Sequence, residues 1–171
     1  ITLTNEAATN AIFEDVVFNY VDGWTISVEN VDSREWISVW YDNGKLKYTV
    51  EANNDYEYRQ AYIKITAKRE GKEDIFENVW IYQKGQIMPI AISELKNQSV
   101  IDYNEYRVTG ILASKATKES GTTTLRDING NEAKFTYIHT TDGKTFHDNS
   151  DDVNLGDVVT IVGVITGKSG D

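Results

Sequence analysis

Aromatic side chains at alternating positions are the residues of this sequence best suited to contact a ligand. Tyr62 and Lys64 lie two residues apart in one predicted strand and so share a face, as do Trp80 and Tyr82 in the next strand. We predict that the two strands pair antiparallel, with Tyr62 beside Tyr82 and Lys64 beside Trp80. Rings that share one sheet face can stack on the apolar C–H faces of sugars. Alternatively, the same rings cap the sheet or pack against the other domain.

Two further aromatic residues, Trp40 and Tyr41, lie next to an Asn-Gly pair that is typical of a tight hairpin turn. Their position beside a turn makes them candidates for exposed ligand contacts. Trp24 shares a strand face with the apolar Ile26 and Val28 instead, so we expect its ring to pack in the core.

Acidic side chains are the second group with potential chemistry, because carboxylates are ligands for Ca²⁺. They crowd one segment, at Asp148, Asp151, Asp152 and Asp157. The run that begins at Asp127 fails the EF-hand pattern, since Glu132 replaces the required Gly and Ile138 the final Glu. We interpret both segments as solvated acidic loops and predict no metal site.

No residue pattern in the sequence indicates catalysis. The two histidines, His139 and His147, lack zinc-type spacing, and the chain contains no cysteine. A nucleophile elbow, a P-loop and a dinucleotide fingerprint are absent. We therefore predict that the protein is not an enzyme, has no catalytic residues and needs no cofactor.

The composition excludes further classes of protein. The chain has 171 residues, with 17 Lys+Arg against 27 Asp+Glu and a formal net charge of −10. That balance disfavours nucleic-acid binding, which needs positive charge to displace phosphate counterions. No apolar run approaches the ~20 residues that cross a bilayer. We expect no transmembrane segment, and composition leaves the oligomeric state undetermined.

Period-two alternation of apolar and polar residues predicts an all-β chain. The only proline, Pro89, follows the strand 75–83 and favours a domain boundary near it, which gives domains 1–86 and 87–171. In the first domain, about six short strands predict a β-sandwich. In the second, Ser93 is a candidate cap for one helical turn, and four strands are expected at 106–114, 122–127, 132–139 and 157–166. The apolar run 158–165 suits a strand covered on both faces.

The first half resembles the BACON domain, an immunoglobulin-like β-sandwich of Bacteroidetes surface and secreted proteins. The resemblance covers about residues 1–86 and is carried by Gly23-Trp24, Trp36-Ile37-Ser38-Val39, Asn53-Asn54 with Arg59, Ala61-x-Ile63-x-Ile65-Thr66 and Val79-x-Ile81-x-Gln83-x-Gly85. It departs at Trp40-Tyr41, where small and Pro-rich residues are expected. The family implies carbohydrate or mucin binding for some members and a spacer role for others.

The second half resembles the OB-like domains of bacterial secreted proteins, which form a partly open Greek-key barrel. The residues that carry this resemblance are Tyr106-Arg107-Val108-Thr109-Gly110-Ile111, Leu125-x-Asp127, Gly143-Lys144-x-Phe146 and Leu155-Gly156-Asp157-Val158-Val159-Thr160-Ile161-Val162-Gly163. The last barrel strand is not evident before Asp171, so residues beyond it are candidates to complete the domain. OB folds bind oligonucleotides or oligosaccharides on one face.

Together these features predict a non-catalytic, secreted or outer-membrane surface module that binds glycan or mucin weakly by aromatic stacking. The predicted binding residues are Tyr62, Trp80, Tyr82, Trp40 and Tyr41. The alternative is a structural spacer or a scaffold that binds a protein partner within a larger cell-surface assembly. No signal or lipoprotein segment is visible, so we expect the chain to be a trimmed or mature product.

Overall fold

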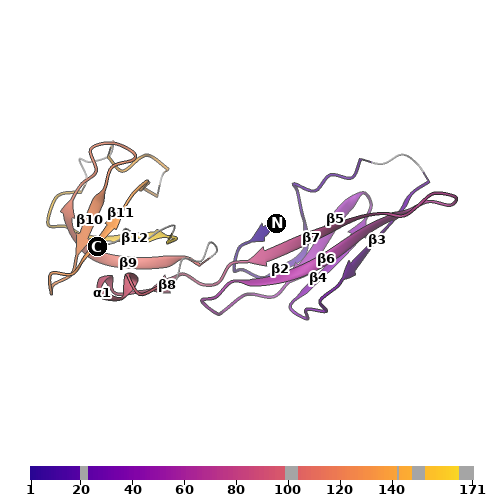
Figure 1. Cartoon of the computed structure of the whole chain (residues 1–171), viewed down its shortest axis with the longest axis horizontal. Coiled ribbons are helices and arrows are strands. Elements are labelled where there is room, and N and C mark those ends of the chain that lie inside the picture. Colours follow the sequence, from indigo (N-terminus) through magenta and orange to yellow (C-terminus); the bar gives the residue numbers. More distant parts are fainter. Residues whose placement is uncertain (20–22, 99–103, 142, 148–152, 166–171) are drawn as a thin grey trace. The chain divides into compact units, whose positions relative to one another are not determined.

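Strands account for almost all regular structure in the chain, and the predicted all-β class is confirmed. The computed structural model describes residues 1–19, 23–98, 104–141, 143–147 and 153–165. Within it the chain divides into two compact units, Ile1–Gln86 and Ile87–Asp171 (Figure 1). Each unit is described separately below.

The first unit contains a four-stranded and a three-stranded sheet (Figure 1). The larger sheet has the order β1-β7-β6-β3, with β1 parallel to β7 and the other pairs antiparallel. Its strands are β1 (Thr2–Leu3), β7 (Ile75–Gln83), β6 (Arg59–Lys68) and β3 (Thr25–Asn30). The smaller sheet is antiparallel, with the order β2 (Ala8–Ile12), β5 (Lys45–Val50) and β4 (Ile37–Asp42).

The two sheets share one hydrophobic core, because alternate residues of both point inward. Its buried members are Phe13, Ile37, Leu46, Val50, Ala61, Ile63 and Ile81. Leu46, Ile63 and Ile81 are fully buried. Burying each such side chain stabilises the fold by about 1.5–3 kcal/mol.

The predicted Asn-Gly hairpin is confirmed between β4 and β5. Asn43 has a φ of 49° and Gly44 a φ of 80°, the positive values that a two-residue type I′ turn requires. The turn closes the ladder directly, because Asp42 pairs with Lys45.

The predicted register of β6 against β7 is wrong by two residues. Tyr62 pairs with Trp80, and Tyr82 pairs with Gln60, whereas we expected Tyr62 beside Tyr82. The ladder begins at the pair Ala67 and Ile75, so the hairpin is centred on Gly71, which has a φ of 71°, and not on residue 72 as the expected pairing requires. A shift of two keeps every side chain on its predicted face, because side chains alternate with a period of two.

A buried polar network fixes the end of β7. It includes Trp36, Arg59 and Gln83, which belong to the residue series that carries the sequence resemblance of the first half. The side chain of Gln83 is fully buried, and its Oε1 accepts a hydrogen bond of 2.8 Å from Arg59 Nε. Its Nε2 donates to the carbonyl of Glu51 at 2.9 Å. The guanidinium of Arg59 lies 4.4 Å from the ring centroid of Trp36, and burial lowers its pKa. These residues stabilise the fold rather than form an accessible site.

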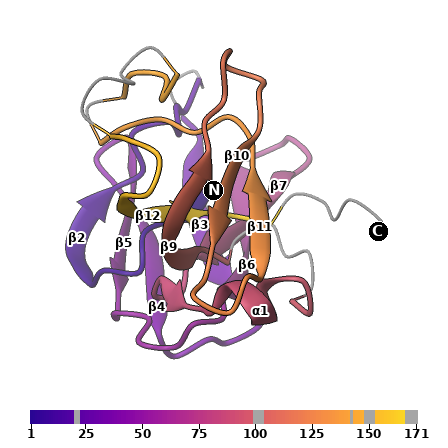
Figure 2. The same ribbon diagram turned by 90° about the vertical axis from the view of Figure 1, so that its left-hand side faces the viewer.

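The second unit contains one five-stranded sheet, whose main path is β11-β10-β9-β12 (Figure 2). Neighbours on that path are antiparallel, and β8 pairs parallel with β9. The strands are β8 (Met88–Pro89), β9 (Tyr106–Ser114), β10 (Thr123–Arg126), β11 (Glu132–Phe135) and β12 (Val158–Gly163). The described residues do not close this sheet into a barrel.

A single helical turn, α1 (Ile92–Leu95), packs on the inward face of this sheet. The predicted turn is confirmed, but its cap is not: Ala91 occupies the N-cap position, and Ser93 lies inside the helix. Gly110 permits the close approach of α1, because a Cβ there would lie 2.6 Å from Ile92 Cδ1. Among the described residues no helix has the length and apolar character needed to cross a membrane.

The expectation that β12 is covered on both faces is wrong for the described residues. Val158 is 71% exposed and Val162 is 47% exposed, while Val159 and Ile161 pack against the core. The strand therefore alternates between a core face and an open face.

Candidate functional site

The outer face of β6 and β7 gathers the aromatic residues that the sequence singled out. The inward face of these strands carries the buried Ala61, Ile63 and Ile81, so the alternate positions point away from the core. Tyr62, Trp80 and Tyr82 occupy those outward positions. The structure thus brings three of the five predicted site residues together on one surface.

Tyr62 and Trp80 form the centre of this surface. They are directly opposite in the ladder, and their ring centroids lie 4.6 Å apart with an interplanar angle of 39°. Trp80 is 45% exposed, whereas Tyr62 is half-buried. An exposed indole held by a neighbouring phenol offers an apolar surface with polar groups at its rim.

The same face carries aromatic residues that our sequence reasoning missed. The ring of Tyr58 lies 6.1 Å from that of Tyr82. Phe76 is 56% exposed, and the ammonium of Lys64 lies 4.5 Å from its ring centroid. Extending the alternation backward from Tyr62 and Trp80 by four residues would have found both. We call the surface formed by Tyr58, Tyr62, Phe76, Trp80 and Tyr82 the aromatic face.

Trp40 and Tyr41 do not belong to the aromatic face. Both lie in β4, which is part of the other sheet, and as neighbours in a strand they point to opposite sides of it. Tyr41 pairs with the buried Leu46 and makes an edge contact with Phe18, with centroids 4.9 Å apart. Trp40 is half-buried on the outer side.

Trp24, which we expected in the core, immediately precedes β3, is half-buried and is not among the residues of the core cluster. Trp36 does pack against the core of the first unit, beneath the guanidinium of Arg59.

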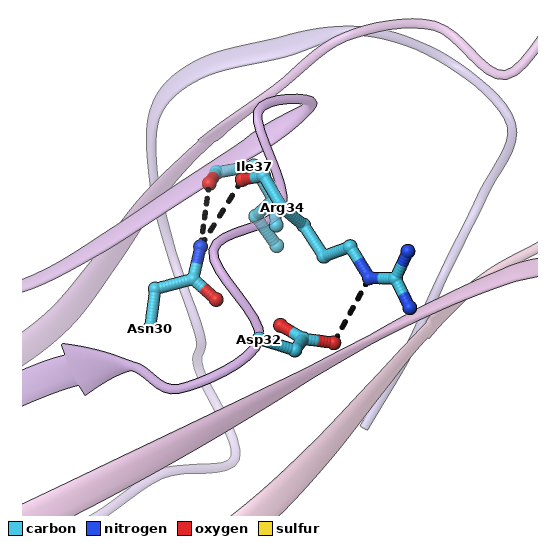
Figure 3. Close-up of polar contacts among 4 residues, drawn as sticks. All are labelled: Asn30, Asp32, Arg34 and Ile37. Carbon is cyan, nitrogen blue, oxygen red and sulfur yellow. Dashed lines mark hydrogen bonds and ion pairs between the residues drawn. The ribbon is translucent and has the colours of Figure 1, made fainter.

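The loop between β3 and β4 contains a polar cluster away from the aromatic face (Figure 3). Asn30 Nδ2 donates to the carbonyls of Arg34 at 3.1 Å and Ile37 at 3.2 Å, and Arg34 pairs with Asp32 at 3.0 Å. Asn30 Oδ1 and Asp32 Oδ1 are buried without a hydrogen-bond partner. Two oxygens are too few for Ca²⁺, which takes six to eight ligands. This cluster fixes the connection between the sheets.

The hairpin between β10 and β11 contains another polar cluster, centred on Asp127. Asp127 Oδ1 accepts hydrogen bonds from the backbone N–H groups of Asn129 and Asn131, each at 2.9 Å. Hydrogen bonds, above all from the Asn131 side chain, lower the pKa of Asp127.

No group of acidic or histidine side chains in the described ranges is arranged to hold a metal ion. Asp148, Asp151 and Asp152 lie outside those ranges, and Asp157 accepts a hydrogen bond from the backbone of Asn154 at 2.7 Å. His139 Nε2 lies 4.0 Å from Glu119 Oε1 on the surface.

The second unit presents an open apolar surface of a different kind. A shallow hollow of about 290 Å³ is lined by Thr109, Gly110, Ile111, Arg126, Asp127, Ile128 and Val158. Ile128 is 92% exposed and carries no aromatic neighbour in that lining. Aliphatic side chains of this type suit protein contacts better than stacking on sugars.

Comparison with known proteins adds no family assignment: no protein-family model matches the chain, and no curated protein matches it. The candidate site therefore depends on its geometry and on the sequence resemblances alone.

Proposed function

We propose that the protein is a non-catalytic module that binds glycan or mucin through the aromatic face. The observation that supports this most directly is Trp80, an indole that is 45% exposed and whose ring centroid lies 4.6 Å from that of Tyr62. Leaving a large apolar ring half-exposed costs solvation free energy that a stacked sugar ring would recover. Polar groups of Tyr62 and Tyr82 at the rim supply hydrogen bonds to sugar hydroxyls.

The same proposal includes the finer fold and the location. The two-sheet first unit, with the buried residues Asn53 and Gln83 and the half-buried Arg59, is compatible with a BACON-like immunoglobulin-type sandwich. The five-stranded second unit is compatible with an OB-like domain that is partly open. These resemblances support a secreted or cell-surface protein, in which a glycan-binding module has a use.

The test is a titration of the full chain with mucin glycans and plant polysaccharides, measured by calorimetry. We expect weak, saturable binding that Trp80→Ala lowers at least about tenfold, since buried tryptophan contacts dominate binding energies. Trp40→Ala is the matched control, because Trp40 is half-buried on the other sheet and should leave binding unchanged. Circular dichroism verifies that both variants are folded. Equal affinity of the Trp80→Ala variant and the wild type would contradict the proposal.

A protein-interaction scaffold is the second candidate, and the exposed Ile128 and Val158 beside the hollow favour it. Light scattering of the chain at rising concentration tests one form of this function, self-association. We expect Val158→Asp to abolish any association, because a desolvated carboxylate opposes burial of the surface.

A further inference from the structure

The aromatic face is elongated along β7. Its outward positions are Phe76, Asn78, Trp80 and Tyr82, every second residue over a stretch of seven in one strand. A strand rises about 3.3 Å per residue, so this row extends for roughly 20 Å. That length far exceeds one sugar ring.

Aromatic rings lie at both ends of the row. At one end, Trp80 contacts Tyr62 and Tyr82 approaches Tyr58. At the other end, Phe76 is 56% exposed and lies under the ammonium of Lys64. Between Phe76 and Trp80 the side chain of Asn78 is exposed, and its amide offers donors and an acceptor to hydroxyl groups. The row thus alternates apolar and hydrogen-bonding surface along one direction.

The lysines on this side of the sheet have acidic residues as neighbours. Lys64 has Glu29 as its direct neighbour on β3, and Lys68 forms an ion pair of 3.1 Å with Asp74. The chain as a whole carries a formal net charge of −10. The negative charge of the whole molecule would therefore repel an acidic polysaccharide.

From this geometry we infer that the aromatic face binds a neutral, linear, ribbon-like glycan that lies along β7 and contacts the rings at both ends of the row. The inference rests on the proposed glycan-binding function and adds the substrate class. An extended β-1,4-linked chain presents flat sugar faces in a straight line, which matches a row of rings on a strand. A helical α-linked chain curves away from such a row after one or two units.

The test is calorimetry on the full chain with cellobiose, cellotetraose and cellohexaose, with maltohexaose as the matched helical control. We expect affinity to rise at least about tenfold from cellobiose to cellohexaose and to stay unchanged between low and high salt. Maltohexaose should bind no better than cellobiose. Phe76→Ala should lower the affinity for cellohexaose severalfold and leave that for cellobiose unchanged, whereas Trp80→Ala should weaken both.

The outcomes separate this inference from the function on which it rests. Equal affinity for cellobiose and cellohexaose, or a Phe76→Ala variant that binds cellohexaose as well as the wild type, overturns the extended site. Binding of other panel glycans through Trp80 without binding of cellohexaose also overturns it, although the aromatic face would still be a glycan site. Loss of all glycan binding would remove both. Urea midpoints close to that of the wild type verify that both substitutions act on the surface.

Discussion

The two units cover the inward face of their principal sheets in different ways. The first unit uses a second sheet, and a buried polar network around Gln83 holds the connecting segments. The second unit uses the single turn α1, which approaches the sheet closely because Gly110 has no side chain. Their outer faces differ as well, since one presents aromatic rings and the other aliphatic side chains. A half-exposed ring pair and an open aliphatic surface therefore imply different ligands.

The largest expected effect concerns the polar network of the first unit. Gln83→Ala removes a fully buried side chain, leaves Arg59 Nε without its acceptor and takes one of two hydrogen bonds from the carbonyl of Glu51. Buried groups that lose their hydrogen bonds are costly, so we expect the free energy of unfolding to fall by about 2–4 kcal/mol. Urea denaturation measures this change.

Gln60→Ala is the matched control for that substitution. Gln60 is half-buried on the outward face of β6, opposite Tyr82, and its loss should cost no more than about 0.5 kcal/mol. Similar losses for the two variants would contradict the distinction between a network that stabilises the fold and a face that is free to bind.

A smaller effect is expected from the close approach of α1 in the second unit. Gly110→Ala would place a Cβ 2.6 Å from Ile92 Cδ1 and 3.2 Å from the carbonyl oxygen of Arg126. Ile92 is only 4% exposed and has little room to move, so overpacking should cost about 1–3 kcal/mol. Urea denaturation of the full chain measures the loss.

Gly163→Ala serves as the control, because within the described part of the chain no heavy atom beyond its immediate chain neighbours lies within 4 Å of the position its Cβ would take. Its stability should stay within about 0.5 kcal/mol of the wild type. A destabilised Gly163→Ala variant beside an unaffected Gly110→Ala variant would reverse our account of how this unit packs.

The sequence predicted the faces of the strands better than their partners. Alternation is a local property, and it correctly places Tyr62, Trp80 and Tyr82 on one face, with Ile63 and Ile81 on the other. The register depends on the number of residues in the hairpin loop, which alternation does not specify because a shift of two leaves each face unchanged.

Burial was the other property that local pattern could not supply. Val158 and Val162 lie in an apolar run that is typical of a strand covered on both faces, and yet they are exposed. Exposure depends on which other elements pack on the strand. For Trp40 and Tyr41, by contrast, the local pattern was sufficient. Adjacent strand residues point to opposite sides, so these two could not both belong to one site. That conclusion was available from the sequence.

The smallest expected effect tests whether the β10–β11 hairpin depends on a charge, unlike the Asn43-Gly44 hairpin of the first unit. Asp127 accepts hydrogen bonds from Asn129 and Asn131, and these lower its pKa. A carboxyl whose pKa is lower in the folded state stabilises the fold above the ordinary value of about 3.9, and this contribution disappears as the pH falls through the folded value. Asp127→Asn should therefore be slightly less stable than the wild type at pH 7, and the difference should vanish once the pH falls below the lowered pKa of the folded state. Urea midpoints of both proteins across this range provide the measurement. A difference that stayed constant with pH would show that the shape of the side chain, rather than its charge, holds the turn.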